Sequence, residues 1–293
     1  METDVADVTE ADVRAAFDAQ AYVADDEVVT TVTLALRLSK PLLVEGAPGA
    51  GKTELASVLA AGFDTDLLRL QCYEGLTAEH ALYEWNYTKQ LLAVQSGADE
   101  GSVFAEAYLL ERPLLAALRA DGDRLPVLLI DEIDRADEAF EALLLEVLDD
   151  FQVSIPELGT VAASTPPIVV LTSNRTRSLG DALKRRCLYL HLEPPNFERE
   201  LEIVERKVPQ IDAALAAEVC GVVQQLRERP LHKRPGVAET LDWAEALSAL
   251  DRDSLTVETV ESTLGCLLKD AADAARFDTE AIRDVLTAAR SGE

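Results

Sequence analysis

The stretch LVEGAPGAGKTEL, from Leu43 to Leu55, follows an apolar run and places three glycines and one lysine within eight residues. Residues 46–53 fit the pattern GxxxxGK[ST], and the residues after them have the apolar periodicity of a helix. A loop with so little side chain lets backbone N–H groups wrap a polyphosphate without clashes from Cβ atoms. The positive end of the following helix also favours a phosphate there. The stretch therefore predicts a nucleotide-binding loop between a strand and a helix.

Two side chains of this loop have predicted roles beyond the backbone. Lys52 is expected to reach the β- and γ-phosphates of ATP, and the Thr53 hydroxyl is expected to bind Mg²⁺. The expected nucleotide-binding positions are Gly46, Ala47, Pro48, Gly49, Ala50, Gly51, Lys52, Thr53 and Glu54.

Five apolar runs predict strands, and stretches of helical periodicity separate them. The runs lie at 41–46, 66–73, 125–132, 166–174 and 187–192. Strands that alternate with helices indicate a parallel sheet covered on both faces. After the prolines at 194–195 the pattern is helical only, over 198–208, 213–229, 236–250 and 257–277. The expected fold class is α/β: a five-stranded parallel P-loop domain over residues 1–195, then a small all-helical domain over 196–293.

Polar side chains follow the third and fourth predicted strands. In VLLIDEID, Asp131 suits a Mg²⁺ contact, and Glu132 suits polarisation of an attacking water. In VVLTSN, Asn174 is expected to hold that water near the γ-phosphate, or else to cap the next helix. Because neighbouring strand tips of a parallel sheet meet at one edge, these groups predict ATP hydrolysis rather than binding alone.

A basic pair, Arg185 and Arg186, comes just before the fifth predicted strand. We interpret one of them, preferably Arg186, as an arginine finger that reaches the nucleotide of a neighbouring subunit. A residue that completes a neighbour's site requires a head-to-tail contact, and such contacts close into rings. The pair therefore predicts a homo-oligomer.

Composition narrows the function classes. Against 54 acidic residues there are 27 basic ones, which gives a net charge of −27. This balance fits a salt-adapted surface or a basic partner, and it argues against nucleic-acid binding. The N-terminus METDVADVTEADV lacks a signal-peptide pattern, and no apolar run is long enough to span a membrane, so we expect a cytoplasmic protein. The four cysteines form no CxxC pair, so reduced thiols are expected rather than a structural metal.

With these motifs in this order and a helical tail, the chain resembles the AAA+ ATPases from about Val23 onward. It looks most like the MoxR branch. That assignment depends on the segments QCYEGLTAEHALYEWNYTKQLLAV (71–94), ERPLLAALRADG (111–122) and FQVSIPELGTVAAS (151–164). The last reads as a β-hairpin with a turn near 157–159.

The resemblance implies a lid domain at the C-terminus, a hexameric ring, and chaperone-like remodelling of a client protein. It also implies a von Willebrand factor A domain protein as a partner. A sub-branch with a similar YEWNY segment is associated with maturation of molybdenum hydroxylases such as carbon monoxide dehydrogenase, so the client would be a metalloenzyme. AAA+ lids usually carry an arginine that contacts the γ-phosphate. Here Arg234 precedes a proline beside Lys233, which leaves that role open.

Other readings stay open. The segments 71–94 and 111–122 lie where the MoxR branch carries an insertion in its second helix. Tyr83, Trp85 and Tyr87 either contact a client or anchor this inserted segment. The second function class is a AAA+ nucleic-acid motor or loader, which stimulation of ATP hydrolysis by DNA would reveal. A small-molecule P-loop kinase would not need the arginine pair, and a slow ATP-binding switch would differ from a motor in turnover alone.

Overall fold

The computed structural model describes residues 7–97, 103–120, 125–155 and 159–291. The chain divides into two compact units. Unit 1 comprises Met1–Gln20, Ala24–Glu45 and Lys52–His191, and unit 2 comprises Ala21–Val23, Gly46–Gly51 and Leu192–Glu293. Each unit has a hydrophobic core of its own.

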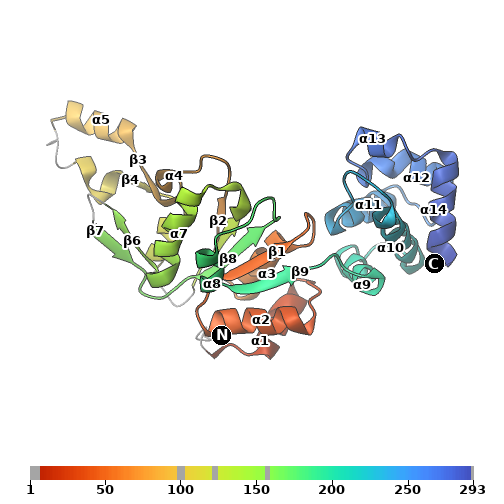
Figure 1. Ribbon diagram of the computed structural model, residues 1–293, viewed down its shortest axis with the longest axis horizontal. Coiled ribbons are helices and arrows are strands. Elements are labelled where there is room, and N and C mark those ends of the chain that lie inside the picture. The colour runs from red at the N-terminus through yellow and green to blue at the C-terminus, as the bar shows by residue number, and fades with distance from the viewer. Residues whose placement is uncertain (1–6, 98–102, 121–124, 156–158, 292–293) are drawn as a thin grey trace. The chain divides into compact units, whose positions relative to one another are not determined.

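A five-stranded sheet forms the centre of unit 1 (Figure 1). Its strands are β1 (Leu42–Gly46), β2 (Leu67–Gln71), β5 (Val127–Asp131), β8 (Ile168–Ser173) and β9 (Leu188–Leu192), in the order β2-β5-β8-β1-β9. The pairs β2–β5, β5–β8 and β8–β1 are parallel. The predicted fold class, with five parallel strands followed by helices, is confirmed.

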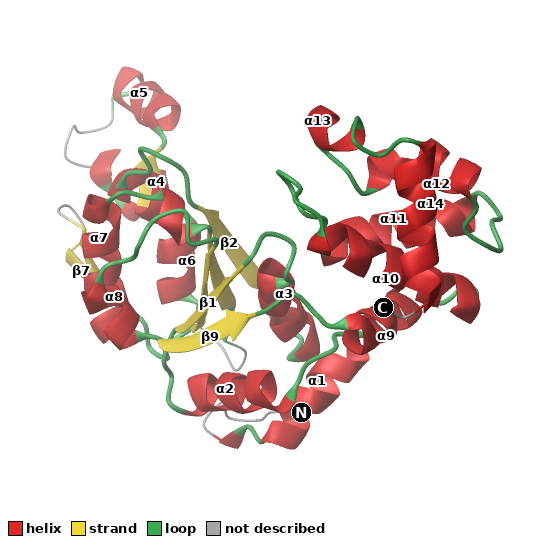
Figure 2. Cartoon of the chain, turned by 45° about the vertical axis from the view of Figure 1, so that its right-hand side comes forward, coloured by secondary structure: helices red, strands yellow, loops and turns green. Residues whose placement is uncertain are grey.

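Both faces of this sheet are covered, because adjacent residues of β5 are buried on opposite sides. Leu128 and Ile130 belong to a core that includes α6 (Pro113–Arg119) and α7 (Glu138–Asp150). Val127 and Leu129 are equally buried, and α3 (Lys52–Gly62) contacts β5. Figure 2 shows α6 and α7 on one side of the sheet and α3 on the other. This double cover agrees with the continuous apolar runs in the sequence.

Two N-terminal helices pack against each other, and the first of them packs against α3. The first, α1 (Glu10–Ala19), begins with a capping box formed by Thr9 and Asp12. The second, α2 (Asp26–Arg37), begins at the N-cap Asp25. A Cβ on Gly62 would lie 2.5 Å from the Cβ of Ala16, so the close approach of α1 and α3 requires glycine there.

Two antiparallel hairpins extend unit 1. The expected hairpin is confirmed as β6 (Gln152–Ile155) paired with β7 (Gly159–Ala162); residues 156–158 of its turn lie outside the described residues. The second hairpin pairs β3 (Tyr83–Trp85) with β4 (Leu109–Glu111) and lies in the segment of residues 78–111, which is called the insertion below. The helices and strands of the insertion are α4 (Ala78–Leu82), β3 (Tyr83–Trp85), α5 (Tyr87–Gln95), a 3₁₀ turn (Glu106–Tyr108) and β4 (Leu109–Glu111).

Unit 2 is helical around the fully buried Trp243, whose indole N–H donates to Thr263. A buried ion pair joins Glu200 to Arg227, and Thr240 also donates to Glu200. The helices are α9 (Phe197–Lys207), α10 (Ala213–Glu228), α11 (Val237–Ala249), α12 (Val257–Thr263), α13 (Ala271–Ala274) and α14 (Thr279–Ser291).

One predicted helix of this unit is wrong. The run 257–277 does not form a single helix: a 3₁₀ turn (Leu264–Cys266) ends α12, and α13 starts only after Asp270. Asp270 caps α13 by accepting from the backbone N–H groups of Ala272 and Asp273. The apolar periodicity continued through the break, because residues on both sides pack into the same core. None of the described helices is long and apolar enough to cross a membrane.

Candidate nucleotide site

The glycine-rich residues 46–51 connect β1 to α3 along the chain. Gly49 has φ +78° and Gly51 has φ +85°, and the N–H of Ala50 bonds to the carbonyl of Ala47. A side chain at either glycine would be strained in this left-handed region. The turn therefore needs glycine at both positions, and the sequence motif specifies the second of them, Gly51.

Lys52 opens α3 and is 6% exposed. Burial lowers the pKa of its ammonium group, whereas the negative charges of Asp134, Asp131 and Glu132 raise it and oppose the effect of burial. A partly desolvated ammonium group among three acids is suited to binding an anionic phosphate.

Thr53 and Asp131 meet between α3 and the tip of β5. The Thr53 hydroxyl donates to Oδ1 of Asp131 over 3.0 Å, and the Thr172 hydroxyl donates to the same oxygen over 2.6 Å. Oxygen ligands at adjacent octahedral positions around Mg²⁺ lie about 2.9 Å apart. The spacing and the chemistry of these two oxygens fit a magnesium ion.

Glu132 has a strained backbone and a carboxylate held at several points. Its φ is +54°, and its N–H donates to the Thr172 hydroxyl. Non-glycine residues in this conformation concentrate at functional sites. Three side chains donate to its carboxylate: Gln71 over 3.1 Å, Asn174 over 3.3 Å and Arg135 over 3.1 Å. The acid is thus oriented beside the Thr53–Asp131 pair.

Asn174 lies at the tip of β8 and does not cap the next helix. That helix, α8 (Asp181–Arg186), begins after Gly180, whose N–H donates to Glu141. Asn174 instead donates its side-chain N–H to Glu132, and its backbone N–H donates to Asp134. The structure therefore brings together the tips of β5 and β8, as the parallel pairing predicted.

Asp134 is a site residue that the sequence reading missed. It is 2% exposed and accepts from the backbone N–H groups of Asn174 and Thr176 and from the Thr176 hydroxyl. Burial alone would raise the pKa of its carboxyl group, but these hydrogen bonds lower it below the ordinary value. Asp134 therefore fixes the segment that carries Asn174.

Arg69 and Gln71 of β2 also reach the strand tips and were also missed. Arg69 donates to Oδ2 of Asp131 over 2.5 Å and to Gln71 over 2.8 Å. Polar residues at alternate positions of an otherwise apolar strand share one face, and this was the available signal. Which strand lay next to β2 was not evident from the sequence.

The arginine pair does not join this cluster. Arg186 donates to both carboxylate oxygens of Asp149 and to the carbonyl of Ala182, whereas Arg185 is exposed. Hydrogen bonds from Arg186 lower the pKa of Asp149. Arg234 of unit 2 is exposed in the segment before α11. The hydrogen bonds of Arg186 and the exposure of Arg185 therefore place neither arginine at the strand tips of its own chain.

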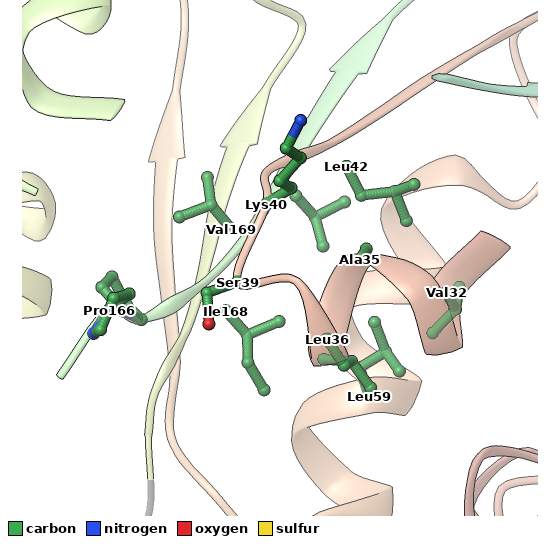
Figure 3. A pocket seen from close by; sticks show the side chains of 12 residues that line it. Val32, Ala35, Leu36, Ser39, Lys40, Leu42, Leu59, Pro166, Ile168 and Val169 are labelled. Atoms are coloured by element: carbon green, nitrogen blue, oxygen red, sulfur yellow. The ribbon is translucent and has the colours of Figure 1, made fainter. Parts of the chain in front are cut away.

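A pocket elsewhere in unit 1 is not a second nucleotide site. It lies between α2 and the beginnings of β1 and β8, with Leu36, Leu42 and Ile168 among its lining residues (Figure 3). Its cavity volume of ≈ 20 Å³ accommodates about one water molecule. The strands β1 and β8 are parallel, and the pocket lies where they begin. The cluster of Thr53, Asp131, Glu132 and Asn174 lies at the other, carboxyl ends of the strands.

The cysteines and histidines offer no alternative chemistry among the described residues. All four cysteines are free thiols, and burial raises the pKa of Cys72, Cys187 and Cys220 to about 12. His232 lies near Asp270 and Asp273, but both Asp273 oxygens accept backbone N–H groups, from His232 and Lys233. The Asp273 carboxylate thus serves as an acceptor for the backbone at residues 232–233, which explains the cluster.

A P-loop followed by Asp-Glu and Asn at neighbouring strand tips defines a nucleotide-binding P-loop protein. A family model for the AAA domain (dynein-related subfamily) matches residues 41–187, and the chain belongs to this family. It is therefore an ATP-hydrolysing AAA+ enzyme.

Individual relatives have low sequence identity to this chain, but the similarity extends over most of its length. The Holliday junction branch migration complex subunit RuvB of Thermotoga petrophila is 24% identical over 288 residues, which cover 92% of this chain and 75% of RuvB. The denitrification regulatory protein NirQ of Stutzerimonas stutzeri is 25% identical over 207 residues, 68% of each chain. A solved structure of Thermotoga maritima RuvB superposes with a TM-score of 0.52 at 23% identity, covering 86% of this chain and 72% of that one. This likeness supports the fold.

Replacing Lys52 with alanine tests the phosphate contact. We expect the dissociation constant of ADP to rise about 10- to 100-fold, because a charge-assisted contact to phosphate is lost. Isothermal titration calorimetry measures it. Lys40→Ala is the matched control, since Lys40 is exposed. Equal ADP affinity in Lys52→Ala and the control would remove Lys52 from the site.

Proposed function

We propose that the chain hydrolyses ATP with Mg²⁺ in a homo-oligomeric, hexameric ring and uses the energy to remodel or mature a client protein, as in the MoxR branch. The observation that supports hydrolysis best is the position of Glu132, held by Asn174 and Gln71 beside the Thr53–Asp131 pair. A general base needs this kind of fixed orientation toward its water.

Each residue of the cluster then has a chemical role. The loop 46–51 and the first turn of α3 with Glu54 hold the phosphates, and Lys52 neutralises their charge. Thr53 and Asp131 hold Mg²⁺, which supplies charge neutralisation on the phosphate oxygens when bound. Glu132 accepts the proton of the attacking water, and Asn174 orients that water. Asp134 keeps Asn174 in place through the backbone.

The ring follows from the arginines at the end of α8. The bonds of Arg186 go to Asp149 and Ala182 rather than to Glu132 or Asp131. We infer that Arg186, or Arg185 beside it, completes the site of a neighbouring copy. The relative RuvB is a subunit of a branch migration complex, which favours assembly into an oligomer.

The insertion supports a protein client. Gln90 is the one buried residue of α5, and that helix exposes Tyr87, Leu91 and Leu92 by 67%, 59% and 59%. Exposed apolar groups gathered on one helix are typical of protein contacts. Trp85 is buried and packs edge-to-face on Tyr83 and Phe104, so it anchors the insertion. Tyr87 remains the aromatic residue that we assign to client contact.

The helical residues 196–293 are proposed as a lid domain on an ATPase domain of residues 1–195, with Arg234 as its contact to the γ-phosphate. The client is proposed to be a metalloenzyme, with a von Willebrand factor A domain protein as partner. The relative NirQ is a denitrification regulatory protein, which favours a role for this chain in the service of an enzyme system.

The alternative is a nucleic-acid motor, which the RuvB relatives favour. The net charge of −27 opposes it, because binding along a phosphate backbone needs clustered basic residues. The two readings differ in what stimulates hydrolysis.

Phosphate release should be measured with four-way junction DNA, with duplex DNA, and with a metal-free molybdenum hydroxylase plus a von Willebrand A domain protein. Low and molar salt should both be used. We expect stimulation by the protein pair and none by DNA. A variant with Tyr87, Leu91 and Leu92 changed to serine should lose that stimulation and keep its basal rate. Stimulation by junction DNA alone would replace the client proposal with the motor.

A further inference from the structure

The guanidinium group of Arg69 lies against the carboxylate of Asp131. Its Nη2 donates to Oδ2 over 2.5 Å and to Oε1 of Gln71 over 2.8 Å. The Asp131 side chain is 4% exposed, whereas the Arg69 side chain is 52% exposed. The ion pair therefore joins a buried acid to a base that retains access to solvent.

Asp131 has different partners on its two oxygens. Oδ1 accepts from the hydroxyls of Thr53 and Thr172, and Oδ2 accepts from Arg69. An ionised carboxylate that is withdrawn from water needs a positive charge nearby. Arg69 supplies that charge directly at Oδ2.

The register of β2 explains how Arg69 reaches this place. β2 is an edge strand, and Gln71 aligns with Asp131 across the β2–β5 pair. Arg69, two residues earlier, lies on the same face of β2 as Gln71. The neighbours Leu68 and Leu70 face the core on the other side. The long side chain of Arg69 thus extends along the strand to its tip.

We propose that Arg69 competes with the divalent cation for Asp131, so that Mg²⁺-nucleotide binding must displace the guanidinium group. This rests on the proposed role of Thr53 and Asp131 as magnesium ligands. A guanidinium and a doubly charged ion a few ångströms apart repel each other strongly in a partly buried site. Because Arg69 is half-exposed on an edge strand, its side chain has room to leave toward solvent.

The same displacement affects Glu132. Arg69 donates to both Asp131 and Gln71, and Gln71 donates to Glu132. These four side chains form one hydrogen-bonded series from the proposed metal ligand to the proposed base. When Arg69 leaves Asp131, its bond to Gln71 also changes. Arg69 is therefore a positioning residue that links cation binding to the orientation of Glu132.

The test is the Mg²⁺ dependence of ADP binding by the full-length chain. ADP is titrated by calorimetry across a Mg²⁺ series and in EDTA, for wild type, Arg69→Met and Arg69→Lys. We expect Arg69→Met to lower the half-saturating Mg²⁺ concentration about tenfold, with Arg69→Lys close to wild type. Affinity for ADP in EDTA should not change, since Arg69 does not bind phosphate. Mn²⁺ binding followed by electron paramagnetic resonance gives a readout without nucleotide.

Controls separate the outcomes. Arg112→Met removes an arginine of similar exposure, paired with Glu84 in the insertion, and should leave the Mg²⁺ dependence unchanged. If Arg69→Met unfolds, Arg69→Gln keeps a donor without charge and is expected to shift the same way. An unchanged Mg²⁺ dependence in a folded variant overturns the competition, and weaker ADP binding in EDTA overturns it in favour of a phosphate contact. Wild-type binding of ADP that ignores Mg²⁺ would instead overturn the metal site itself, and the inference with it.

Discussion

Glu132→Gln should lower kcat for ATP by about 10²- to 10⁴-fold while ATP affinity stays near wild type. Glutamine keeps the size of the side chain and an oxygen for the donors Asn174 and Gln71, but it cannot take a proton from water. Single-turnover phosphate release gives the rate, and calorimetry gives the affinity.

The matched control is Glu138→Gln, an exposed acid in the first turn of α7. It should hydrolyse ATP at the wild-type rate. If Glu132→Gln kept more than a third of wild-type turnover, Glu132 would not be the base. Asp134 would then be the next acid to examine, although its bonds to Asn174 and Thr176 leave it little freedom.

Arg186→Ala should lower kcat by about 10³- to 10⁵-fold and leave ATP affinity largely intact. A finger contributes when charge develops on the transferred phosphoryl group, so its loss appears in turnover rather than in binding. Arg185→Ala is the companion variant that decides between the two arginines. Steady-state phosphate release at saturating ATP measures both.

The ion pair of Arg186 supplies a second control. Asp149→Ala removes the partner that holds the guanidinium group in the isolated chain and leaves the arginine itself. We expect turnover within a few-fold of wild type, because a finger acts on the neighbour's nucleotide. Wild-type turnover in both Arg186→Ala and Arg185→Ala would discard the finger.

Local sequence patterns predicted the central sheet of unit 1 and the P-loop that follows β1. The strands β1, β5 and β8 were evident because both faces of the sheet are covered there, which makes each of them a nearly continuous apolar run. The P-loop was evident because residues 46–53 match GxxxxGK[ST]. Glycine at positions 49 and 51 permits the left-handed backbone that the loop adopts. Asp131 and Asn174 were placed together because parallel neighbours end at one edge.

Contacts between distant segments were not predictable in the same way. The order β2-β5-β8-β1-β9 brings Arg69 and Gln71 to Asp131 and Glu132, and no local pattern encodes that order. The role of Asp134 was not predicted, because the groups that bond to it lie about forty residues later, in the segment after β8. The strands β3 and β4 pair across an insertion whose short runs have no clear period.

In the helical region the sequence predicted one helix where the structure has two. The apolar periodicity was identified correctly, but the predicted helix continued through the break between α12 and α13. Apolar positions there serve one core from two short helices. The signal that marks the break is the capping residue Asp270, which is weak beside a long amphipathic pattern.

We propose that two copies of the chain build one catalytic site. Glu132→Gln and Arg186→Ala chains, each with a different affinity tag, should be co-expressed and purified through both tags, and their ATPase rate measured. Each variant alone is inactive on this account, but an Arg186→Ala chain next to a Glu132→Gln chain has an intact base and receives an intact finger. Random assembly should restore about a quarter of wild-type turnover. A mixed assembly as inactive as its parents would mean that the two residues do not serve one shared site.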